Sequence, residues 1–494
     1  MKLLQIHPHD NVAVALSTLT AGEEVTVNGS LLRIGEEVAV GHKVALVALD
    51  EGQDVVKYAS PIGHATQRIP AGGWVHTHNL ATNLGEILSY TYNPAGGPWQ
   101  PSPCARTFQG FVRENGEVGI RNEIWIIPTV GCVNTVAERL ARDAAARHAG
   151  RGVEGVHTFP HPYGCSQLGG DHATTQRILA DLAHHPNAAG VLIVGLGCEN
   201  NHLAAFKEVL GAVNPDRVKF LNCQDVDDEY EEGGRLLDQL TDYVESFVRQ
   251  PVPIARLKVG LKCGGSDAFS GITGNPLVGA FSDLLTACGG TTVLTEVPEM
   301  FGAEHLLMNR CLSTETFDKT VAMVNGFKEY FMRHNQTIYE NPSPGNKAGG
   351  ISTLEEKSLG CTQKAGTHPV VDVLEYGDRL VRPGVNLLAG PGNDIVAQTA
   401  LTAAGAHLIL FTTGRGTPLG APVPTLKIAT NSDLARRKAH WIDVNAGVLL
   451  EGAAMEETAR QLFETVLATA SGDRTHNERN GFREISIFKD GVTL

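Results

Sequence analysis

The sequence contains no run of about 18 apolar residues, the length that a helix needs to cross a bilayer. The first ten residues, MKLLQIHPHD, also lack the apolar stretch of a secretory signal peptide. Positive charge is scarce: the sequence contains 40 Lys and Arg against 54 Asp and Glu, and the formal net charge is -14. We therefore expect a cytoplasmic protein that binds neither nucleic acid nor an anionic membrane, since both partners require clustered cations.

Several nucleotide and metal motifs are missing as well. No GxxxxGK[ST] phosphate-binding loop occurs, and after Gly195-Leu196-Gly197 the third glycine of a dinucleotide fingerprint is replaced by Asn200. No CxxC pair occurs, which argues against a zinc ribbon. The nine cysteines are dispersed and odd in number, so we expect thiols rather than a disulfide framework. The sequence thus predicts no nucleotide cofactor.

The length of 494 residues predicts two or three domains. A first segment, residues 1–90, contains short β-rich runs split by turn signals, and residues 92–104 form a linker rich in Pro and Gly. A second segment, 105–250, alternates strand and helix patterns, and a third, 251–494, is again α/β with long glycine-rich loops. The predicted fold class is α/β: a small, mostly β N-terminal domain followed by two α/β portions with parallel sheets.

The stretch Val191–His202, VLIVGLGCENNH, is the clearest candidate for part of a site. An apolar strand ends in glycines and is followed at once by chemically competent side chains. That order is typical of the carboxyl edge of an α/β sheet, where ligands bind. The pattern recurs at Cys132 and Cys165, so three strand-end turns of the second segment carry a cysteine beside a glycine.

These turns offer ligands for a divalent metal. Soft and borderline ligands dispersed over strand ends are typical of a catalytic metal with open positions. The candidates, each at a strand-end turn, are Cys132, Cys165, His172, Cys198, Glu199, His202, Cys263 and Cys361. In the first segment, His76 and His78 would lie on one face of a strand and could share a metal. The alternatives stay open: buried thiols for the cysteines, and exposed surface side chains for the histidine pair.

Cations inside the glycine-rich loops of the third segment have little apolar surface to cover, which favours a role in binding. The cations in such loops are Lys262, Lys347, Lys364 and Arg415. One could hold a substrate carboxylate, and a desolvated lysine could act as a general base. Glu296, Glu299 and Glu304 flank Pro298 and Phe301-Gly302, and any of them could be an acid, a base or a metal ligand. For each of these residues a salt bridge or a helix cap is the alternative.

Several long loops closely resemble those of the altronate/galactarate dehydratase family. The loops are YGCSQLGGDH, VGLGCENN, GLKCGGSDAFSGITGNP, TEVPEMFGAE, NPSPGNKAGGI, LGCTQKAG, GRGTP and KIATNS. The likeness runs essentially end to end, from IHPHDNVAVAL to FREISIFKDGVTL. It implies that the first segment is an SAF domain and that the larger α/β portion carries the chemistry. It also implies a divalent metal cofactor, Fe²⁺ with Mn²⁺ as the alternative.

The reaction that the resemblance implies converts D-altronate to 2-dehydro-3-deoxy-D-gluconate and water, a step in galacturonate breakdown. A metal chelated by the substrate carboxylate and a hydroxyl would stabilise an enediolate-like intermediate. A base would take the C2 proton, and an acid would protonate the departing C3 hydroxyl. This reaction consumes no redox cofactor. We hypothesise that His76 and His78 reach across to the cysteine turns of the second segment, which would place the site at a domain interface.

The residues proposed for this site fall into three groups. The expected metal ligands are His76, His78, Cys165, Cys198, His202 and Glu199. The acid and base candidates are Lys262, Glu304 and His172. The substrate-binding candidates are Arg415, Lys347, Ser266 and Asn275.

Other functions stay open. Galactarate or another aldarate could be the substrate, but a dicarboxylate needs a second cation at the far end of the pocket. A non-enzymatic sugar-acid-binding protein and a zinc hydrolase are the alternatives from other classes. The expected partners are a small sugar acid and, as for many large α/β enzymes, further copies of the chain in a homo-oligomer.

Overall fold

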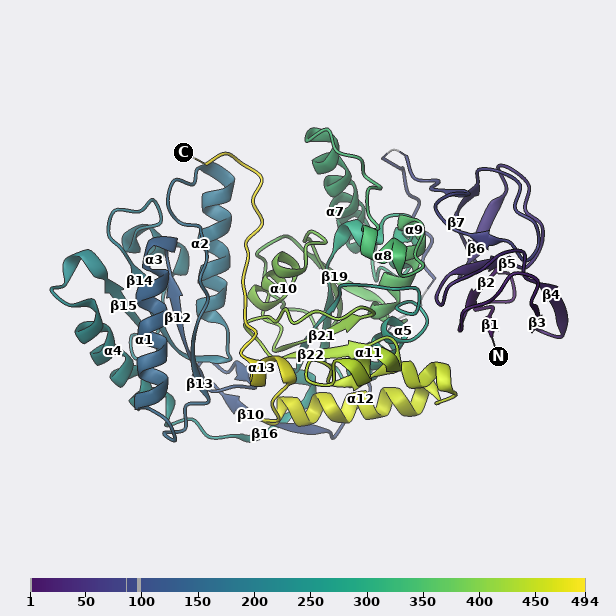
Figure 1. The fold of residues 1–494 in the computed structure, drawn as a ribbon. Helices are drawn as coiled ribbons and strands as arrows, with labels where there is room; N and C mark the ends of the chain where they lie inside the picture. The colour runs from purple at the N-terminus through teal and green to yellow at the C-terminus, as the bar shows by residue number, and fades with distance from the viewer. Residues whose placement is uncertain (1, 86, 96–98, 494) are drawn as a thin grey trace.

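The structure is a computed structural model that describes residues 2–85, 87–95 and 99–493. Three parts lie in a row, with the first segment at one end, the third in the middle and the second at the other end (Figure 1). Parts of the predicted segments lie outside the described residues. These are residues 1 and 494, the outer limits of the predicted segments, and residues 96–98 of the predicted linker. The division into 1–90, 105–250 and 251–494 stays a prediction.

The first segment is built from short antiparallel strands, as its β-rich runs predict. One sheet contains β1 (Leu3–Leu4), β2 (Val12–Ala15), β5 (Lys43–Ala45) and β8 (Trp74–Val75), and another contains β6 (Asp54–Lys57), β7 (Ser60–Ala65) and β9 (Leu80–Ala81). β3 (Glu24–Val27) and β4 (Ser30–Arg33) form a hairpin. Its turn residues Asn28 and Gly29 both have positive φ, 50° and 83°, as a two-residue type I′ turn requires.

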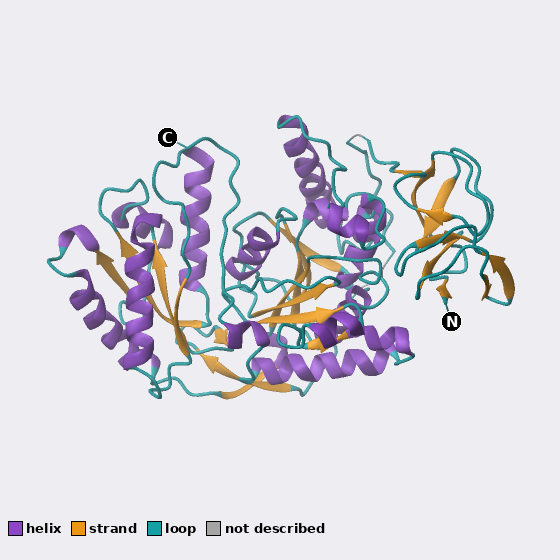
Figure 2. Ribbon diagram, viewed as in Figure 1, coloured by secondary structure: helices purple, strands orange, loops and turns teal. Residues whose placement is uncertain are grey.

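The second segment contains a four-stranded parallel sheet with helices on both faces (Figure 2). The strand order is β13 (Gly155–Thr158), β12 (Glu123–Pro128), β14 (Ala188–Gly195) and β15 (Val218–Asn222). Its helices are α1 (Asn134–Arg147), α2 (Gly169–His184), α3 (Leu203–Leu210) and α4 (Glu229–Val244). Successive side chains of β12 enter different cores: Ile124 and Ile126 pack with residues of α1 and α4, and Trp125 and Ile127 with residues of α2.

The third segment contains a seven-stranded sheet in which all strands are parallel. The order is β19 (Val370–Leu374), β20 (Gly384–Leu388), β18 (Thr291–Leu294), β17 (Lys258–Cys263), β21 (Leu408–Thr413), β22 (Thr425–Ala429) and β23 (Val444–Asn445). The helices are α5 (Gly274–Ala287), α6 (Glu304–Met308), α7 (Thr314–Arg333), α8 (Pro344–Ala348), α9 (Leu354–Cys361), α10 (Asp394–Ala403), α11 (Ser432–Arg437), α12 (Met455–Ala470) and α13 (His476–Asn480). The predicted fold class is confirmed.

The second and third segments share one core. Trp125 and Ile193 of the second segment belong to the same buried cluster as Leu388 and Ile409 of the third. Between the two parallel sheets lies a small antiparallel sheet of β11 (Val118–Gly119), β10 (Thr107–Val112) and β16 (Gln250–Pro253). The two segments therefore hold each other in a fixed relation.

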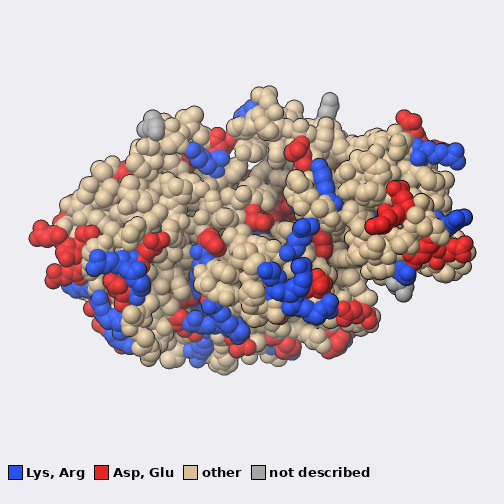
Figure 3. All heavy atoms as spheres, in the orientation of Figure 1, with Lys and Arg blue, Asp and Glu red and all other residues tan. Residues whose placement is uncertain are grey.

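The surface and the helices agree with the absences in the sequence. Asp and Glu are interspersed with Lys and Arg over the face shown in Figure 3, so that this face carries mixed charge. Among the residues that the structure describes, no helix is long and apolar enough to cross a membrane.

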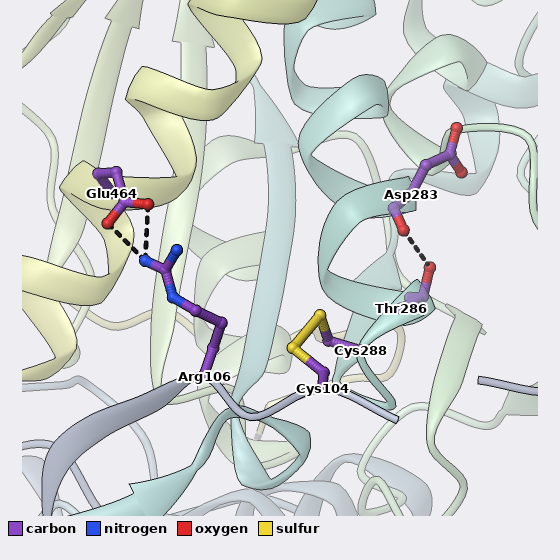
Figure 4. The surroundings of a disulfide bond; sticks show 6 residues. All are labelled: Cys104, Arg106, Asp283, Thr286, Cys288 and Glu464. Carbon is purple, nitrogen blue, oxygen red and sulfur yellow. Dashed lines mark hydrogen bonds and ion pairs between the residues drawn. A yellow bond between two sulfur atoms is a disulfide. The ribbon is translucent and has the colours of Figure 1, made fainter. Parts of the chain in front are cut away.

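Cys104 and Cys288 form a disulfide, which corrects the prediction that all nine cysteines are thiols. Their Cα atoms are 5.1 Å apart, although 184 residues separate them in the sequence. The bond ties the chain before β10 to the end of α5, close to the ion pair of Arg106 and Glu464 (Figure 4). Cysteine spacing alone does not reveal which two residues the fold brings together, so the pair could not be predicted.

A buried ion cluster joins the first segment to the third. Lys43 on β5 and Lys57 on β6 donate to the Glu356 carboxylate on α9, with N–O distances of 2.8 Å and 2.7 Å. All three side chains are at most 1% exposed. Burial opposes ionisation of Glu356, but the two ammonium groups lower its pKa to about 2. This carboxylate therefore stays charged and fixes the first segment on α9.

Replacing Glu356 should loosen this junction strongly. Glu356→Ala leaves two buried ammonium groups without a carboxylate, which typically costs about 3–5 kcal/mol of stability. We expect a lower midpoint of urea unfolding and faster proteolysis between the first and third segments. The control is Asp50→Ala, which removes the exposed pair with Arg68 and should change stability by less than about 0.5 kcal/mol. Equal midpoints for the two variants would contradict the assignment.

Candidate functional site

The carboxyl edge of the seven-stranded sheet gathers the loops that the sequence singles out in the third segment. The loop after β17 begins at Gly264, the loop after β18 contains Glu296 and Glu299, and the loop after β20 leads to Asp394 at the start of α10. Because parallel strands end at one edge, residues more than 100 positions apart meet there. Lys357 and Cys361 reach the same place from α9.

A cluster of buried charges lies under this edge. The Lys262 ammonium donates to Glu296 Oε1 at 2.6 Å and to Asp394 Oδ1 at 2.8 Å. Lys357 Nζ lies 2.7 Å from Glu299 Oε1. Lys364 Nζ lies 3.4 Å from Glu296 Oε2. Glu296 itself has left-handed backbone angles, φ 69° and ψ 53°, which are costly for a non-glycine residue and are common at functional sites.

Two thiols complete the cluster. The Sγ atoms of Cys263 and Cys361 are 3.3 Å apart, and both lie near Glu299 Oε2, at 3.2 Å and 3.1 Å. The Lys364 ammonium lies 2.8 Å from Cys263 Sγ. The hydrogen bond between Cys361 and Cys263, together with burial, raises the pKa of the Cys361 thiol well above the usual value. Cys361 therefore stays protonated.

The charges of this cluster fix its protonation states. Burial disfavours the ammonium form of Lys262, but the carboxylates of Glu296 and Asp394 outweigh it and raise the pKa of Lys262 above its usual value. Burial also opposes ionisation of Glu299, yet Lys357 and Lys364 lower the pKa of Glu299 to about 2. Lys262 is thus a fixed ammonium group, which does not suit the general base expected of it.

A pocket of about 510 Å³ opens onto this cluster. Its lining includes Glu299, Lys357 and Asp394 from the cluster, together with the predicted residue Lys347 and the Gly264-Gly265 turn. Two lysines and three carboxylates, of which Glu340 is the third, thus line one space large enough for a sugar acid.

Arg415 lies at a second, larger depression. This hollow of about 730 Å³ is lined by Arg415, Arg436 and Arg437 of the third segment and by Val40 and Gly41 of the first. The Arg415 guanidinium lies 3.5 Å from the carbonyl oxygen of Gly345. The structure therefore places Arg415 and Lys347 at different openings of the same sheet edge.

The remaining candidates of the third segment lie inside the protein. Asn275 donates to the Gly360 carbonyl at 3.1 Å and accepts from Thr412 Oγ1 at 2.6 Å. Asn275 and Ser266 line a small cavity of about 10 Å³, room for about one water molecule. Glu304 pairs with Lys328 at 3.0 Å and accepts a hydrogen bond from Tyr90. It does not line the 510 Å³ pocket.

The structure does not bring the predicted metal ligands together in the single chain. The first segment and the second segment lie at opposite ends, with the third segment between them (Figure 1). His76 Nδ1 is 2.9 Å from Ser352 Oγ, and both His76 and His78 contact the Trp74 ring. The hypothesis that the histidine pair reaches the cysteine turns is therefore wrong for one chain.

The second-segment candidates lie at the carboxyl edge of their own sheet, as predicted. Cys165 and Cys198 are exposed thiols. The buried Glu199 carboxylate accepts from Thr129 Oγ1 at 2.8 Å and from the Gly197 amide at 2.6 Å, so it orders its own turn. His202 caps α3, with Nδ1 accepting from the Ala205 amide at 3.3 Å. His172 lies in the first turn of α2.

The metal that the resemblance implies can be tested against these ligands. Among the described residues, one group of His, Cys, Asp or Glu ligand atoms lies within 4.8 Å of one another: Cys263, Glu299 and Cys361. Their spacing of 3.1–3.3 Å is that of hydrogen bonds, whereas metal–sulfur bonds of about 2.3 Å hold sulfur ligands about 3.8 Å apart. Two ammonium groups already contact the group, and a dication there would be repelled. These residues do not fit a divalent metal.

Lys427 is a buried lysine that the sequence analysis missed as a candidate. It lies on β22, with Nζ 3.3 Å from the Phe411 ring centroid and without a hydrogen-bond partner. Burial is the main cause that lowers the pKa of Lys427 to about 7; Lys262 adds to it, and Asp394 opposes it. The signal in the sequence that could have identified Lys427 is a lysine inside the apolar pattern of a strand.

Lys427 should make stability depend on pH. The folded pKa of about 7 lies below that of the unfolded lysine, so the unfolded chain binds more protons and stability rises from pH 7 to 10. Lys427→Met removes this penalty, so at pH 7 it should be more stable by an amount of order 3–5 kcal/mol, shrinking towards pH 10. Urea unfolding at several pH values measures the difference. The exposed control, Lys319→Met, should show no such trend; a pH-independent effect of Lys427→Met would contradict the assignment.

Two parallel sheets and a pocket where lysines meet ionised carboxylates define an enzyme for acid–base chemistry on a small anionic substrate. Residues 254–493 match the family described as D-galactarate/altronate dehydratase, C-terminal. Residues 110–245 match the second domain of D-galactarate dehydratase/altronate hydrolase, and residues 1–83 match the altronate/galactarate dehydratase SAF domain. The chain belongs to the altronate/galactarate dehydratase family, a family of hydro-lyases, as its loops predict.

Individual relatives cover the whole chain. Altronate dehydratase of Escherichia coli (strain K12) is 54% identical over 495 residues, which are 100% of both chains. Altronate dehydratase of Bacillus subtilis (strain 168) is 53% identical over 99% of both chains. Galactarate dehydratase (L-threo-forming) of Escherichia coli is 33% identical over 98% of this chain and 96% of its own.

Proposed function

We propose that this protein dehydrates D-altronate to 2-dehydro-3-deoxy-D-gluconate. Two relatives that carry the name altronate dehydratase support the substrate, because they are 53–54% identical over essentially the whole chain. The observation that carries the mechanism is the 510 Å³ pocket, where Lys347 and Lys357 lie in the same lining as Glu299 and Asp394.

In this proposal the two lysines bind the substrate carboxylate. An ammonium pair offers charged hydrogen bonds to the carboxylate and stabilises the negative charge that builds on it when the C2 proton leaves. Lys357 already contacts Glu299 at 2.7 Å. When the substrate carboxylate binds, it shares the Lys357 ammonium with Glu299. The ion pair between Lys357 and Glu299 is then weaker, and the basicity of Glu299 rises.

Glu299 and Asp394 then act on neighbouring carbon atoms. Glu299 accepts the C2 proton, the C–H electron pair forms the C2–C3 double bond, and the C3 hydroxyl leaves with a proton as water. That proton is the one that Glu299 has taken from C2, so the step needs no other donor. The Asp394 carboxylate, which the Lys262 ammonium contacts at 2.8 Å, accepts a hydrogen bond from the C3 hydroxyl and orients it. The enol product tautomerises to the 2-keto acid. Lys262 is thus a positioning group rather than the base.

Three further expectations stay proposals. The family resemblance implies divalent iron, with manganese as the alternative, and no step above depends on it. Galactarate is the second candidate substrate, favoured by the relative that is 33% identical. A 2-keto-3-deoxy acid formed from altronate but not from galactarate would decide for the first substrate. A homo-oligomer also stays a prediction.

Glu299→Gln should remove the base while keeping the shape of the pocket. We expect kcat for altronate to fall at least about 100-fold with little change in KM, because general-base catalysis typically contributes this much. The control is Glu340→Gln, which alters a carboxylate in the same lining and should keep kcat within a few-fold. A Glu299→Gln enzyme with the kcat of the original protein would exclude Glu299 as the base.

Lys347→Ala should weaken substrate binding. Loss of one charged hydrogen bond to the carboxylate predicts a KM raised about 10-fold or more. Arg415→Ala serves as the comparison, because Arg415 lies at the neighbouring 730 Å³ depression. If Arg415→Ala raises KM and Lys347→Ala does not, the substrate binds at that other depression, as the sequence analysis expects for Arg415.

A further inference from the structure

Two arginines of the second segment are packed into the protein without a carboxylate partner. Arg113 follows β10 and is 6% exposed, and Arg217, which is half-buried, precedes β15. Among the described residues, every hydrogen bond of the two guanidinium groups goes to a carbonyl or amide oxygen. Such oxygens are neutral, so they satisfy the N–H groups and leave both positive charges uncompensated.

The buried lysines of the chain show how unusual this is. Lys43, Lys262 and Lys357 each contact a carboxylate, at distances of 2.6–2.8 Å. Lys427 has no such contact, and its pKa of about 7 lets it give up the proton instead. An arginine keeps its proton at neutral pH, so it cannot follow Lys427. A buried guanidinium without a carboxylate therefore calls for an anion from outside the chain.

The two guanidinium groups are fixed close to one another. Arg113 Nε donates to the Pro186 carbonyl at 2.9 Å, and Arg217 Nη2 donates to the carbonyls of His185 and Ala188 at 3.2 Å and 2.8 Å. Both side chains are thus anchored on the same four residues. Burial, followed by the nearby charge of Arg217, lowers the pKa of Arg113 to about 9, which still leaves both groups charged at neutral pH.

Both arginines line a cavity of about 320 Å³, here called the amino-edge cavity, whose lining also includes His184 and Tyr243. It lies where β14 and β15 begin, at the edge of the sheet opposite to the cysteine turns. The 510 Å³ pocket and the 730 Å³ depression are lined by different residues. The volume is within the range of small-molecule sites, so the cavity can hold more than a single ion.

Part of the lining is available to a ligand. Arg217 uses only Nη2 in its hydrogen bonds within the described residues, so its Nε and Nη1 can donate to an oxyanion. His184 Nε2 lies 2.9 Å from the Leu210 carbonyl oxygen and must carry the proton. Burial lowers the pKa of His184, so the ring is neutral and its Nδ1 can accept a hydrogen bond from a hydroxyl group.

The carboxylates of the lining lie at its rim. Glu114 is exposed and accepts a hydrogen bond from Asn214 Nδ2. Glu117 has 32% of its side chain exposed and pairs with Arg379 of the third segment at 3.1 Å. The inner end of the cavity is therefore cationic, and the rim offers acceptors for hydroxyl groups. This order fits a molecule with an oxyanion at one end and hydroxyl groups at the other.

We propose that the amino-edge cavity binds a small hydroxylated oxyanion, a sugar acid or a sugar phosphate, at a site separate from the reaction pocket. The oxyanion accepts hydrogen bonds from Arg217 and compensates the charge of Arg113, and the hydroxyl groups bond to His184 and the rim. Because Glu117 at the rim also contacts Arg379, the ligand lies beside a junction of the second and third segments. The proposal does not rest on the proposed function.

Calorimetric titration of the full chain tests this site. The probes are inorganic phosphate, D-gluconate and D-glucose 6-phosphate, each at constant ionic strength. We expect at least one hydroxylated probe to bind more tightly than phosphate, and the tighter of the two identifies carboxylate or phosphate as the preferred oxyanion. Arg217→Met should weaken its binding at least about 10-fold, because a charged hydrogen bond is lost. Equal affinity for all three probes, or no binding, would overturn the proposal.

Matched variants separate this site from the other cationic openings. Arg142→Met removes an arginine of the same segment whose side chain is 74% exposed, and it should keep the affinity of the original protein. Lys347→Ala in the 510 Å³ pocket and Arg437→Ala at the 730 Å³ depression should also keep it. A loss in either of these two variants, with unchanged binding in Arg217→Met, would place the ligand elsewhere. Circular dichroism checks that each variant is folded.

Hydrogen exchange of the unmodified protein needs no substitution. The tighter probe should slow exchange of the backbone amides in residues 113–117 and 212–217, which line the amino-edge cavity. Residues 340–347 line the 510 Å³ pocket and serve as the internal comparison. Slower exchange in 340–347 without any change in 113–117 and 212–217 would overturn the proposal, as would a probe that changes none of these segments.

Discussion

A buried charge is tolerated only where an opposite charge reaches it, and helix α9 meets this requirement on two sides. Glu356 faces the first segment and pairs with Lys43 and Lys57. The next residue, Lys357, pairs with Glu299 at the floor of the pocket. One turn of helix therefore holds the N-terminal domain in place and also positions a carboxylate of the site. Loss of either pair would leave charges in the interior, so the attachment of the first segment and the shape of the pocket depend on each other.

The same requirement explains why Lys262 is a poor base. A lysine buried alone would lose its proton, as Lys427 tends to do against the Phe411 ring. Lys262 instead has two carboxylates within 2.8 Å, and it keeps its proton. The pKa values of these two buried lysines are thus shifted in opposite directions, because their neighbours differ and their burial does not.

The chain has two parallel sheets, and each presents chemically competent residues at its carboxyl edge. In the third segment these are lysines and carboxylates around a pocket, and in the second they are exposed thiols on glycine turns. Backbone geometry accounts for both, since parallel strands end together and their loops share one edge. The charge content of the first edge suits an anionic substrate.

Much of this protein follows from the sequence by itself. Apolar runs that end in glycine predicted the strands and the edges where the site loops lie, and the loops themselves predicted the family. The sequence also marked the Gly-Cys turns at Cys132, Cys165 and Cys198. It could not reveal which distant residues meet, because such contacts depend on how the segments pack. Only the tertiary structure decided that Cys104 pairs with Cys288, that His76 contacts Ser352 far from the cysteine turns, and that Lys262 faces Glu296 and Asp394. Protonation and ligand sets are properties of neighbours in space, and neighbours in space are what a linear pattern does not contain.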